Sequence, residues 1–242
     1  MTSRRKAEAL IAGGRVSVNG KVVTELGRRV NPVDDHIRVE GRALRRASPP
    51  IYLLLNKPAG VMTTLDDEDE RPTVGKLIAS RSRSRVFPVG RLDFDAEGVL
   101  LLTSDGPLAH RLTHPSFRVA KVYRAKVKGS PSPETVRMLE EGVRLDDGQA
   151  QAEQVAVEPT RRGNAWVRLL VREGRQHLVK RLLERVGHPV IRLKRIRFAG
   201  LGVEGLAPGE LRSLTEDEVK RLRTRGRKRS VREGRGRRTE EG

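Results

Sequence analysis

The apolar run from Val99 to Thr103 is the feature that most constrains the fold of this chain. The run is too short to span a membrane and lacks the alternation of a half-buried strand, so it predicts a strand buried on both faces. The segment Gly90-Arg91-Leu92-Asp93 precedes it at a short distance. The carboxylate of Asp93 is therefore expected at the edge of a hydrophobic core, between a basic turn and a buried strand.

Two ordinary explanations of Asp93 have to be considered. The spacing Asp93-x-Asp95-x-Glu97 is similar to the start of a calcium-binding loop. An EF-hand also needs oxygen ligands in its second half, where this chain has Leu100 to Leu102, so calcium is disfavoured. Alternatively, Asp93 and Asp95 form only a polar surface turn before the strand.

The charge of the chain indicates a polyanionic partner. Its 242 residues include 50 Lys and Arg against 31 Asp and Glu, which gives a formal net charge of +19. Cysteine is absent, which excludes disulfides, thiolate zinc sites and thiol catalysis. No apolar stretch approaches ~18 residues and no signal peptide is visible, so a soluble, cytoplasmic protein without a membrane partner is expected.

Residues 1–46 are predicted to form a separate basic module. Ser3 to Ile11 has helical character and is ended by Gly13-Gly14, and Val16 to Val23 alternates around Asn19-Gly20, a strong hairpin signal. This succession resembles the S4-type RNA-binding domain, whose members have a further helix before this point, so the resemblance implies an N-terminally short copy. The alternative is a solvated basic helix without an RNA role. The module's expected RNA-binding residues are Arg4, Arg5, Lys6, Arg15 and Lys21.

Residues 47–50 are predicted to be a short, stiff linker because Pro49 and Pro50 restrict the backbone. The main domain is expected at residues 51–218. Hydrophobic periodicity and capping residues predict helices near 74–79, 133–142 and 176–186. Strands are expected at 51–55, 99–103, 121–128, 154–157, 165–171 and 191–198, and a further strand is expected to end at Val89.

The C-terminal segment, residues 219–242, is predicted to be a basic tail that is disordered beyond a frayed helix. From Lys220 onward it contains eleven Lys and Arg and three Glu, with few apolar residues to bury. Attraction to RNA phosphates is its expected role. The alternative is a tail that only keeps the protein in solution.

Three separated segments closely resemble the pseudouridine synthases of ribosomal RNA, the RsuA/RluB family. They contain Asp93, the sequence Lys121-Val122-Tyr123, and the block from Glu173 to Arg181. The resemblance implies an α+β catalytic domain with a mixed, largely antiparallel sheet, preceded by the S4-type domain. It also implies isomerisation of uridine to pseudouridine without a cofactor or metal.

The resemblance assigns roles to three residues. Asp93 is the catalytic carboxylate, and whether it attacks the sugar, attacks the ring or promotes elimination stays open. Tyr123 stacks on the uracil and is the favoured proton acceptor, although its pattern also fits a tyrosine that fills the core. Arg175 is expected beside Asp93, keeping it ionised, although it could be one surface arginine among many.

Further basic residues are expected to contact RNA. Arg91 lies next to the catalytic position and could occupy the space left by a flipped base. Leu193 is expected to form a wall of the pocket. The remaining expected RNA contacts are Lys57, Lys180, Arg181, Arg192, Lys194 and Arg195. His110 and His114 are four residues apart, but no third ligand is evident, so zinc is disfavoured.

The segment from Leu108 to Pro115 and the basic tail resemble the large-subunit members of the family more than the small-subunit members. A monomeric enzyme acting on 23S ribosomal RNA is therefore expected. The alternatives are an enzyme for 16S ribosomal RNA and a non-catalytic protein that binds ribosomal RNA or assists ribosome assembly. The last alternative does not require Asp93, Tyr123 and Arg175 to converge on one pocket.

Overall fold

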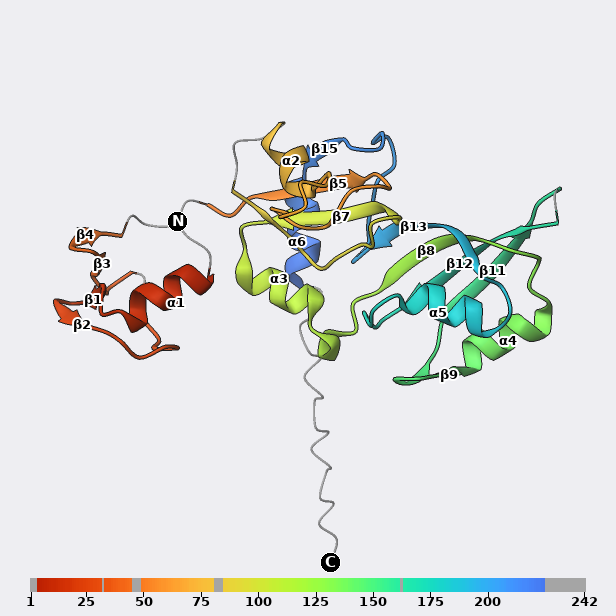
Figure 1. Cartoon of the computed structure of the whole chain (residues 1–242), viewed down its shortest axis with the longest axis horizontal. Helices are drawn as coiled ribbons and strands as arrows, with labels where there is room; N and C mark the ends of the chain where they lie inside the picture. The colour runs from red at the N-terminus through yellow and green to blue at the C-terminus, as the bar shows by residue number, and fades with distance from the viewer. Residues whose placement is uncertain (1–3, 32, 45–48, 81–84, 162, 225–242) are drawn as a thin grey trace, which may run out of the picture. The chain divides into compact units, whose positions relative to one another are not determined.

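The computed structural model describes residues 4–31, 33–44, 49–80, 85–161 and 163–224. The chain divides into two compact units, residues 1–49 and residues 50–242 (Figure 1). The linker residues Ala47 and Ser48 and the tail beyond Thr224 lie outside the described ranges. None of the described helices is long and apolar enough to cross a membrane.

The first unit contains one helix and a small antiparallel sheet. Asn19 and Gly20 have φ angles of 51° and 81°, the left-handed backbone that a two-residue hairpin turn requires. This turn joins two strands at the place where the Asn-Gly signal predicts it. The sheet has the order β2-β1-β3-β4. The elements are α1 (Arg4–Ala12), β1 (Val16–Val18), β2 (Lys21–Val22), β3 (Ile37–Val39) and β4 (Arg42–Ala43).

The second unit is built on a nine-stranded sheet. Its main strand order is β11-β12-β8-β13-β7-β5-β15, and the two remaining strands pair outside this order, β14 with β13 and β6 with β7. Strands β7 and β13 run parallel, whereas the other described pairs are antiparallel. The predicted α+β class with a mixed, largely antiparallel sheet is therefore confirmed. The strands are β5 (Tyr52–Lys57), β6 (Phe87–Pro88), β7 (Glu97–Thr103), β8 (Lys121–Val127), β11 (Glu153–Pro159), β12 (Ala165–Val171), β13 (Val190–Phe198), β14 (Leu201–Gly202) and β15 (Leu211–Ser213).

Helices cover both faces of this sheet. All seven residues of β7 are buried, as its apolar run predicts. Leu100 and Leu102 pack with one set of helices, while Val99 and Leu101, which point to the opposite face, pack with another. The first set is α2 (Val74–Ala79), α4 (Pro133–Glu141) and α5 (Leu178–Arg185). The second is α3 (Gly106–Thr113) and α6 (Glu216–Thr224). The remaining elements are the 3₁₀ turn η1 (Pro115–Phe117) and the hairpin β9 (Val143–Leu145) and β10 (Gly148–Ala150).

The boundary expected at residue 218 is wrong. Helix α6 continues to Thr224, and Leu222 is 1% exposed in the core cluster beneath it. The sequence Thr215-Glu216-Asp217-Glu218 forms a capping box, since Thr215 accepts a hydrogen bond from the Glu218 amide and Glu218 accepts one from the Thr215 amide. Residues 219–224 therefore belong to the second unit.

Strands β7 and β13 approach each other closely at Gly98. This glycine has a φ of 111° and is paired in register with Arg195. A Cβ atom on Gly98 would lie 2.2 Å from the carbonyl oxygen of Arg195. The close approach therefore requires glycine at this position.

Candidate active site

Asp93 lies in a loop between β6 and β7 that a threonine holds in place. The hydroxyl of Thr63 donates a hydrogen bond to the carbonyl of Leu92 (2.6 Å) and accepts one from the amide of Leu92 (3.2 Å). The side chain of Leu92 is buried. The residue before Asp93 is thus fixed through both its backbone and its side chain.

Lys57 supports the same loop from inside the protein. Its side chain is fully buried, and its ammonium group donates to the carbonyls of Ala96 (2.7 Å), Pro58 (3.0 Å) and Phe94 (3.4 Å). Burial lowers the pKa of Lys57 to about 8, against the attraction of nearby carboxylates. The expectation that Lys57 contacts RNA is wrong, because a fully buried ammonium cannot reach a ligand outside.

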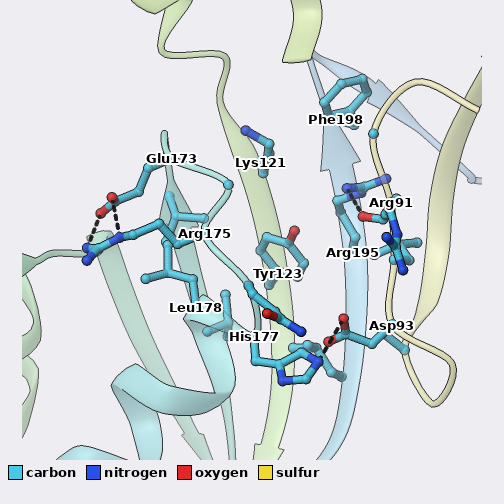
Figure 2. A pocket seen from close by; sticks show the side chains of 18 of the residues that line it. Arg91, Asp93, Lys121, Tyr123, Glu173, Arg175, His177, Leu178, Arg195 and Phe198 are labelled. Carbon is cyan, nitrogen blue, oxygen red and sulfur yellow. Dashed lines mark hydrogen bonds and ion pairs between the residues drawn. The ribbon is translucent and has the colours of Figure 1, made fainter. Parts of the chain in front are cut away.

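Two side chains from the start of α5 face the carboxylate of Asp93. The Nε2 atom of His177 lies 3.4 Å from Oδ1, as Figure 2 shows by a dashed line. The Nζ atom of Lys180 lies 3.7 Å from Oδ2. Lys180 also binds both carboxylate oxygens of Asp95, at 2.7 and 2.8 Å, and lowers the pKa of Asp95. His177 has a left-handed φ of 51° directly before the helix.

Arg175 does not lie beside Asp93, so that part of the prediction is wrong. Its guanidinium binds both oxygens of Glu173, at 2.9 and 3.2 Å, and the carboxylate of Asp147, at 2.9 Å. It also donates to backbone carbonyls of the β9–β10 hairpin, including that of Gln149 at 2.7 Å. Figure 2 shows Arg175 directed toward Glu173 and away from Asp93. Six acceptor atoms, two on Glu173 and four on residues 147–149, determine this direction.

Asp93, Tyr123, Arg175 and Leu193 line a cavity of about 540 Å³. Tyr123 is 9% exposed and comes from β8, so its ring forms part of the cavity wall. Asp93 keeps a 30% exposed side chain. An accessible carboxylate and an aromatic ring in one cavity can hold a planar base and act on the sugar attached to it.

Arg195 is a buried part of the site and not an RNA-binding surface residue, contrary to expectation. It is 2% exposed, and it donates to the carbonyls of Val99 (2.9 Å) and Arg91 (3.4 Å). Its guanidinium also lies 5.0 Å from the ring centre of Phe198. Arg195 therefore connects the loop that carries Asp93 to strand β7.

The other expected RNA contacts differ in accessibility. Arg181 is partly buried and binds Asp147, and Arg192 is exposed and binds the buried Glu97 at 2.7 Å. Lys180 and Lys194 are half-buried. Besides Arg192, the expected RNA contacts with exposed side chains are Arg4, Arg5, Lys6, Arg15, Lys21 and Arg91. Among the described residues, no group of three His, Asp or Glu is placed to hold a metal ion.

Sequence reasoning missed the contact between Asp93 and the start of α5. His177 and Lys180 are three residues apart, so one helical turn brings both to the same side. That spacing, together with the helix predicted at 176–186, was the available signal. The supporting role of Lys57 had no such signal, because a sequence pattern reports the charge of a residue and not its burial.

Comparison with known proteins agrees with this geometry. Residues 51–185 match the RNA pseudouridylate synthase family, and residues 2–42 match the S4 domain. Ribosomal large subunit pseudouridine synthase B of Bacillus subtilis is 45% identical over 226 residues, covering 92% of this chain and 91% of that protein. An uncharacterized RNA pseudouridine synthase of Mycobacterium leprae is also 45% identical, over 224 residues, covering 92% of this chain and 88% of that protein.

A solved structure supports the same assignment. The crystal structure of a pseudouridylate synthase is similar with a TM-score of 0.63 and 29% sequence identity, covering 91% of this chain and 94% of that chain. The resemblance noted in the three sequence segments is therefore confirmed. Since the family match, the curated relatives and the fold agree, this chain belongs to the RNA pseudouridylate synthase family.

Proposed function

We propose that this enzyme converts a uridine of large-subunit ribosomal RNA to pseudouridine, acting as a cytoplasmic monomer. The observation that carries the proposal is the placement of Asp93 and Tyr123 in one cavity, with His177 and Lys180 facing the carboxylate. A protein that only bound RNA would not need this arrangement. The name of the Bacillus subtilis relative favours large-subunit over small-subunit RNA. The second unit of one chain supplies every lining residue of the cavity, so a monomer contains the site that the proposal needs.

The reaction exchanges one bond of the nucleoside for another. The bond between N1 of uracil and C1′ of ribose breaks, the base turns within the cavity, and a bond from C5 to C1′ forms. C5 loses a proton and N1 gains one, so the composition is unchanged and no redox partner is required. Asp93 assists the cleavage, and Tyr123 holds the base by stacking and accepts the C5 proton.

Neighbouring residues position these groups. His177 and Lys180 hold the Asp93 carboxylate at the cavity. The uridine has to leave its stack before it can enter, which costs a few kcal/mol. Arg91 is exposed at the cavity and can take the place of the flipped base. Residues 51–224 form the catalytic domain in this proposal.

The remaining parts of the chain hold the RNA. Residues 1–46, which include the S4 match, present exposed Arg and Lys side chains. The tail after Thr224 adds eight Lys and Arg against three Glu. Contacts of this kind attract phosphates without reading sequence.

The test is to map pseudouridines in ribosomal RNA from cells with and without this protein, and from cells with Asp93→Asn. The loss of one large-subunit pseudouridine in both altered strains is expected. With purified protein, Asp93→Asn should bind the RNA normally and release tritium from C5-labelled uridine at least about 10³-fold more slowly. An unchanged large-subunit map would contradict the choice of RNA, and normal turnover by Asp93→Asn would contradict the site.

A further inference from the structure

Lys121 lies in the cavity on the other side of Tyr123 from Asp93 (Figure 2). Lys121 and Tyr123 are both on β8, two positions apart, so their side chains lie on the same face of the sheet. The charges that act on Lys121 are those of Arg195 and Glu173. The cavity therefore has two distinct polar ends, one at Asp93 and one at Lys121.

The ammonium group of Lys121 has unused hydrogen-bonding capacity. Within the described part of the chain, its acceptor is the carbonyl of Val119, at 3.2 Å. A lysine ammonium has three donors. Burial lowers the pKa of Lys121 to about 8, and the charge of Arg195 adds to this effect. A half-buried cation with unfilled donors is favourable when a ligand supplies the missing acceptors, which indicates that the partner of Lys121 arrives with a ligand.

The nearby carboxylate of Glu173 offsets the charge of Lys121 only in part, because Glu173 is already hydrogen-bonded to Arg175. Both oxygens of Glu173 accept hydrogen bonds from the Arg175 guanidinium. Arg195 adds a second positive charge, and its Nη2 atom is buried without a hydrogen-bond partner among the described residues. Lys121, Arg175 and Arg195 together outnumber the one carboxylate of Glu173, so this end of the cavity carries a net positive charge.

From this arrangement we propose that Lys121 forms an anion subsite that binds a phosphate of the RNA backbone next to the flipped uridine. A cavity of about 540 Å³ lies within the size range of pockets that hold whole small molecules, so it has room for more than the base. A phosphate supplies both the negative charge and the acceptor oxygens that Lys121 lacks. A neutral uracil carbonyl would leave the charge uncompensated. The inference deepens the proposed function, because it names a substrate contact of the same cavity.

The direct test compares uridine 5′-monophosphate, uridine 3′-monophosphate and uridine as ligands of the full-length protein, by calorimetry or NMR titration. This measurement does not depend on turnover or on the identity of the RNA. The wild type should bind one of the monophosphates about tenfold more tightly than uridine. Lys121→Met should lose that preference. Lys126→Met, the same change on the other face of β8, should keep it.

Equal affinity of the wild type for uridine and for both monophosphates would overturn the subsite, even if turnover of ribosomal RNA were normal. A full phosphate preference in Lys121→Met would overturn it as well. With the substrate RNA, a methylphosphonate at the contacted linkage should slow wild-type turnover and have little further effect on Lys121→Met. If the defect of Lys121→Met instead followed replacement of a uracil carbonyl, Lys121 would contact the base and the phosphate assignment would fall.

The role given to Arg175 can be tested separately. Arg175→Met releases Glu173, which can then pair with Lys121 and compete with the phosphate. The preference for the monophosphate should therefore decrease in Arg175→Met and return in the double variant Arg175→Met, Glu173→Gln. An undiminished preference in Arg175→Met, or no recovery in the double variant, would contradict the competition between Glu173 and the phosphate.

Discussion

Lys180 contacts two carboxylates with different geometries. Its bonds to Asp95 are short and bidentate, whereas its contact with Asp93 is 3.7 Å long. Asp95 therefore fixes the position of the ammonium group, while the group still supplies positive charge beside Asp93. Because this division leaves Asp93 without a tight partner, the carboxylate stays available to the substrate.

Replacing Lys180 should impair the chemistry without impairing RNA binding. Lys180→Gln removes the charge beside Asp93, and we expect kcat to fall by about 10²-fold with little change in the affinity for RNA. The control is Arg185→Gln, which removes an exposed charge from the same helix. Single-turnover kinetics and a separate binding assay distinguish the two effects. Equal losses in both variants would show that Lys180 acts only through general attraction of RNA.

Gly98 allows a second prediction about a single residue. Gly98→Ala would place a Cβ atom 2.2 Å from the carbonyl oxygen of Arg195. It would also put a side chain on a residue whose φ is 111°. We expect the free energy of unfolding to fall by more than about 3 kcal/mol, because neither backbone can move without breaking the β7–β13 pairing. Gly106→Ala, where a Cβ atom meets no neighbour, is the control. Urea denaturation measures both, and similar stabilities would contradict the close approach.

The roles of individual residues could be predicted where a sequence motif indicates them, but not where they depend on burial or on contacts with distant segments. Asp93 and Tyr123 were identified from motifs, and both line the cavity. Lys57 and Arg195 were misassigned because a pattern rich in basic residues does not distinguish a solvated cation from one buried against carbonyls. The direction of Arg175 depends on acceptors in the β9–β10 hairpin, which is distant in sequence.

Among the elements, α6 shows how a short helix can be held to the sheet by charge as well as by packing. Arg212 on β15 binds both oxygens of Glu218, each at 2.7 Å. Together with the Thr215 amide, Arg212 lowers the pKa of Glu218 to about 2. The helix is therefore attached to the edge strand of the sheet next to its own N-terminus.

This attachment predicts a pH-dependent stability. The pKa of Glu218 is lowered from 4.5 to about 2 on folding, so its contribution is complete above pH 4.5 and disappears as the pH falls toward 2. Glu218→Gln should cost as much as about 3 kcal/mol at pH 7 and less than half of that at pH 3. Glu216→Gln, which changes a fully solvated carboxylate of the same turn, should cost little. Urea denaturation at both pH values tests the difference, and a deficit independent of pH would contradict the ion pair.

Elements with strong local signals were predicted well. Helix α4 begins after Ser132 and ends at Gly142 as its caps indicate, and β12 spans the predicted residues 165–171. Helix α3 was missed, although Asp105 provides an N-cap signal for it. Helix α6 was expected only as a frayed helix, although Thr215 provides an N-cap signal for it. The many basic residues near the C-terminus led to the prediction of a tail. Leu222, the residue of α6 that is buried, is a single apolar residue in a basic segment and does not by itself indicate a packed helix. The pairing of β15 with β5 has no local signal at all.

For the whole molecule, affinity and chemistry are expected to be separable. Removing residues 225–242 deletes eight Lys and Arg and should weaken RNA binding and flatten the dependence of log affinity on log salt. Turnover at saturating RNA and the free energy of unfolding should stay unchanged. Filter binding at several salt concentrations measures the slope. An unchanged slope would show that the tail does not contact phosphates.

A truncation five residues longer provides the matched comparison. Removing residues 220–242 also removes Leu222, whose burial in the core is worth about 2–4 kcal/mol. That variant should unfold at lower urea concentration than the 225–242 truncation. Equal stability of the two variants would contradict the packing of α6.

The sheet order has a consequence for how the protein is made. Strand β5 pairs with β15 through Leu55 and Leu211, and β7 pairs with β13 through Gly98 and Arg195. During synthesis, β5 and β7 therefore leave the ribosome long before these partner strands exist. The pairings of β1 to β4, in contrast, join neighbours within the first 43 residues. Because long-range pairings form slowly and local ones quickly, the first unit can fold on the ribosome while the nine-stranded sheet of the second unit is still incomplete. A newly made chain would therefore bind RNA before it could modify any.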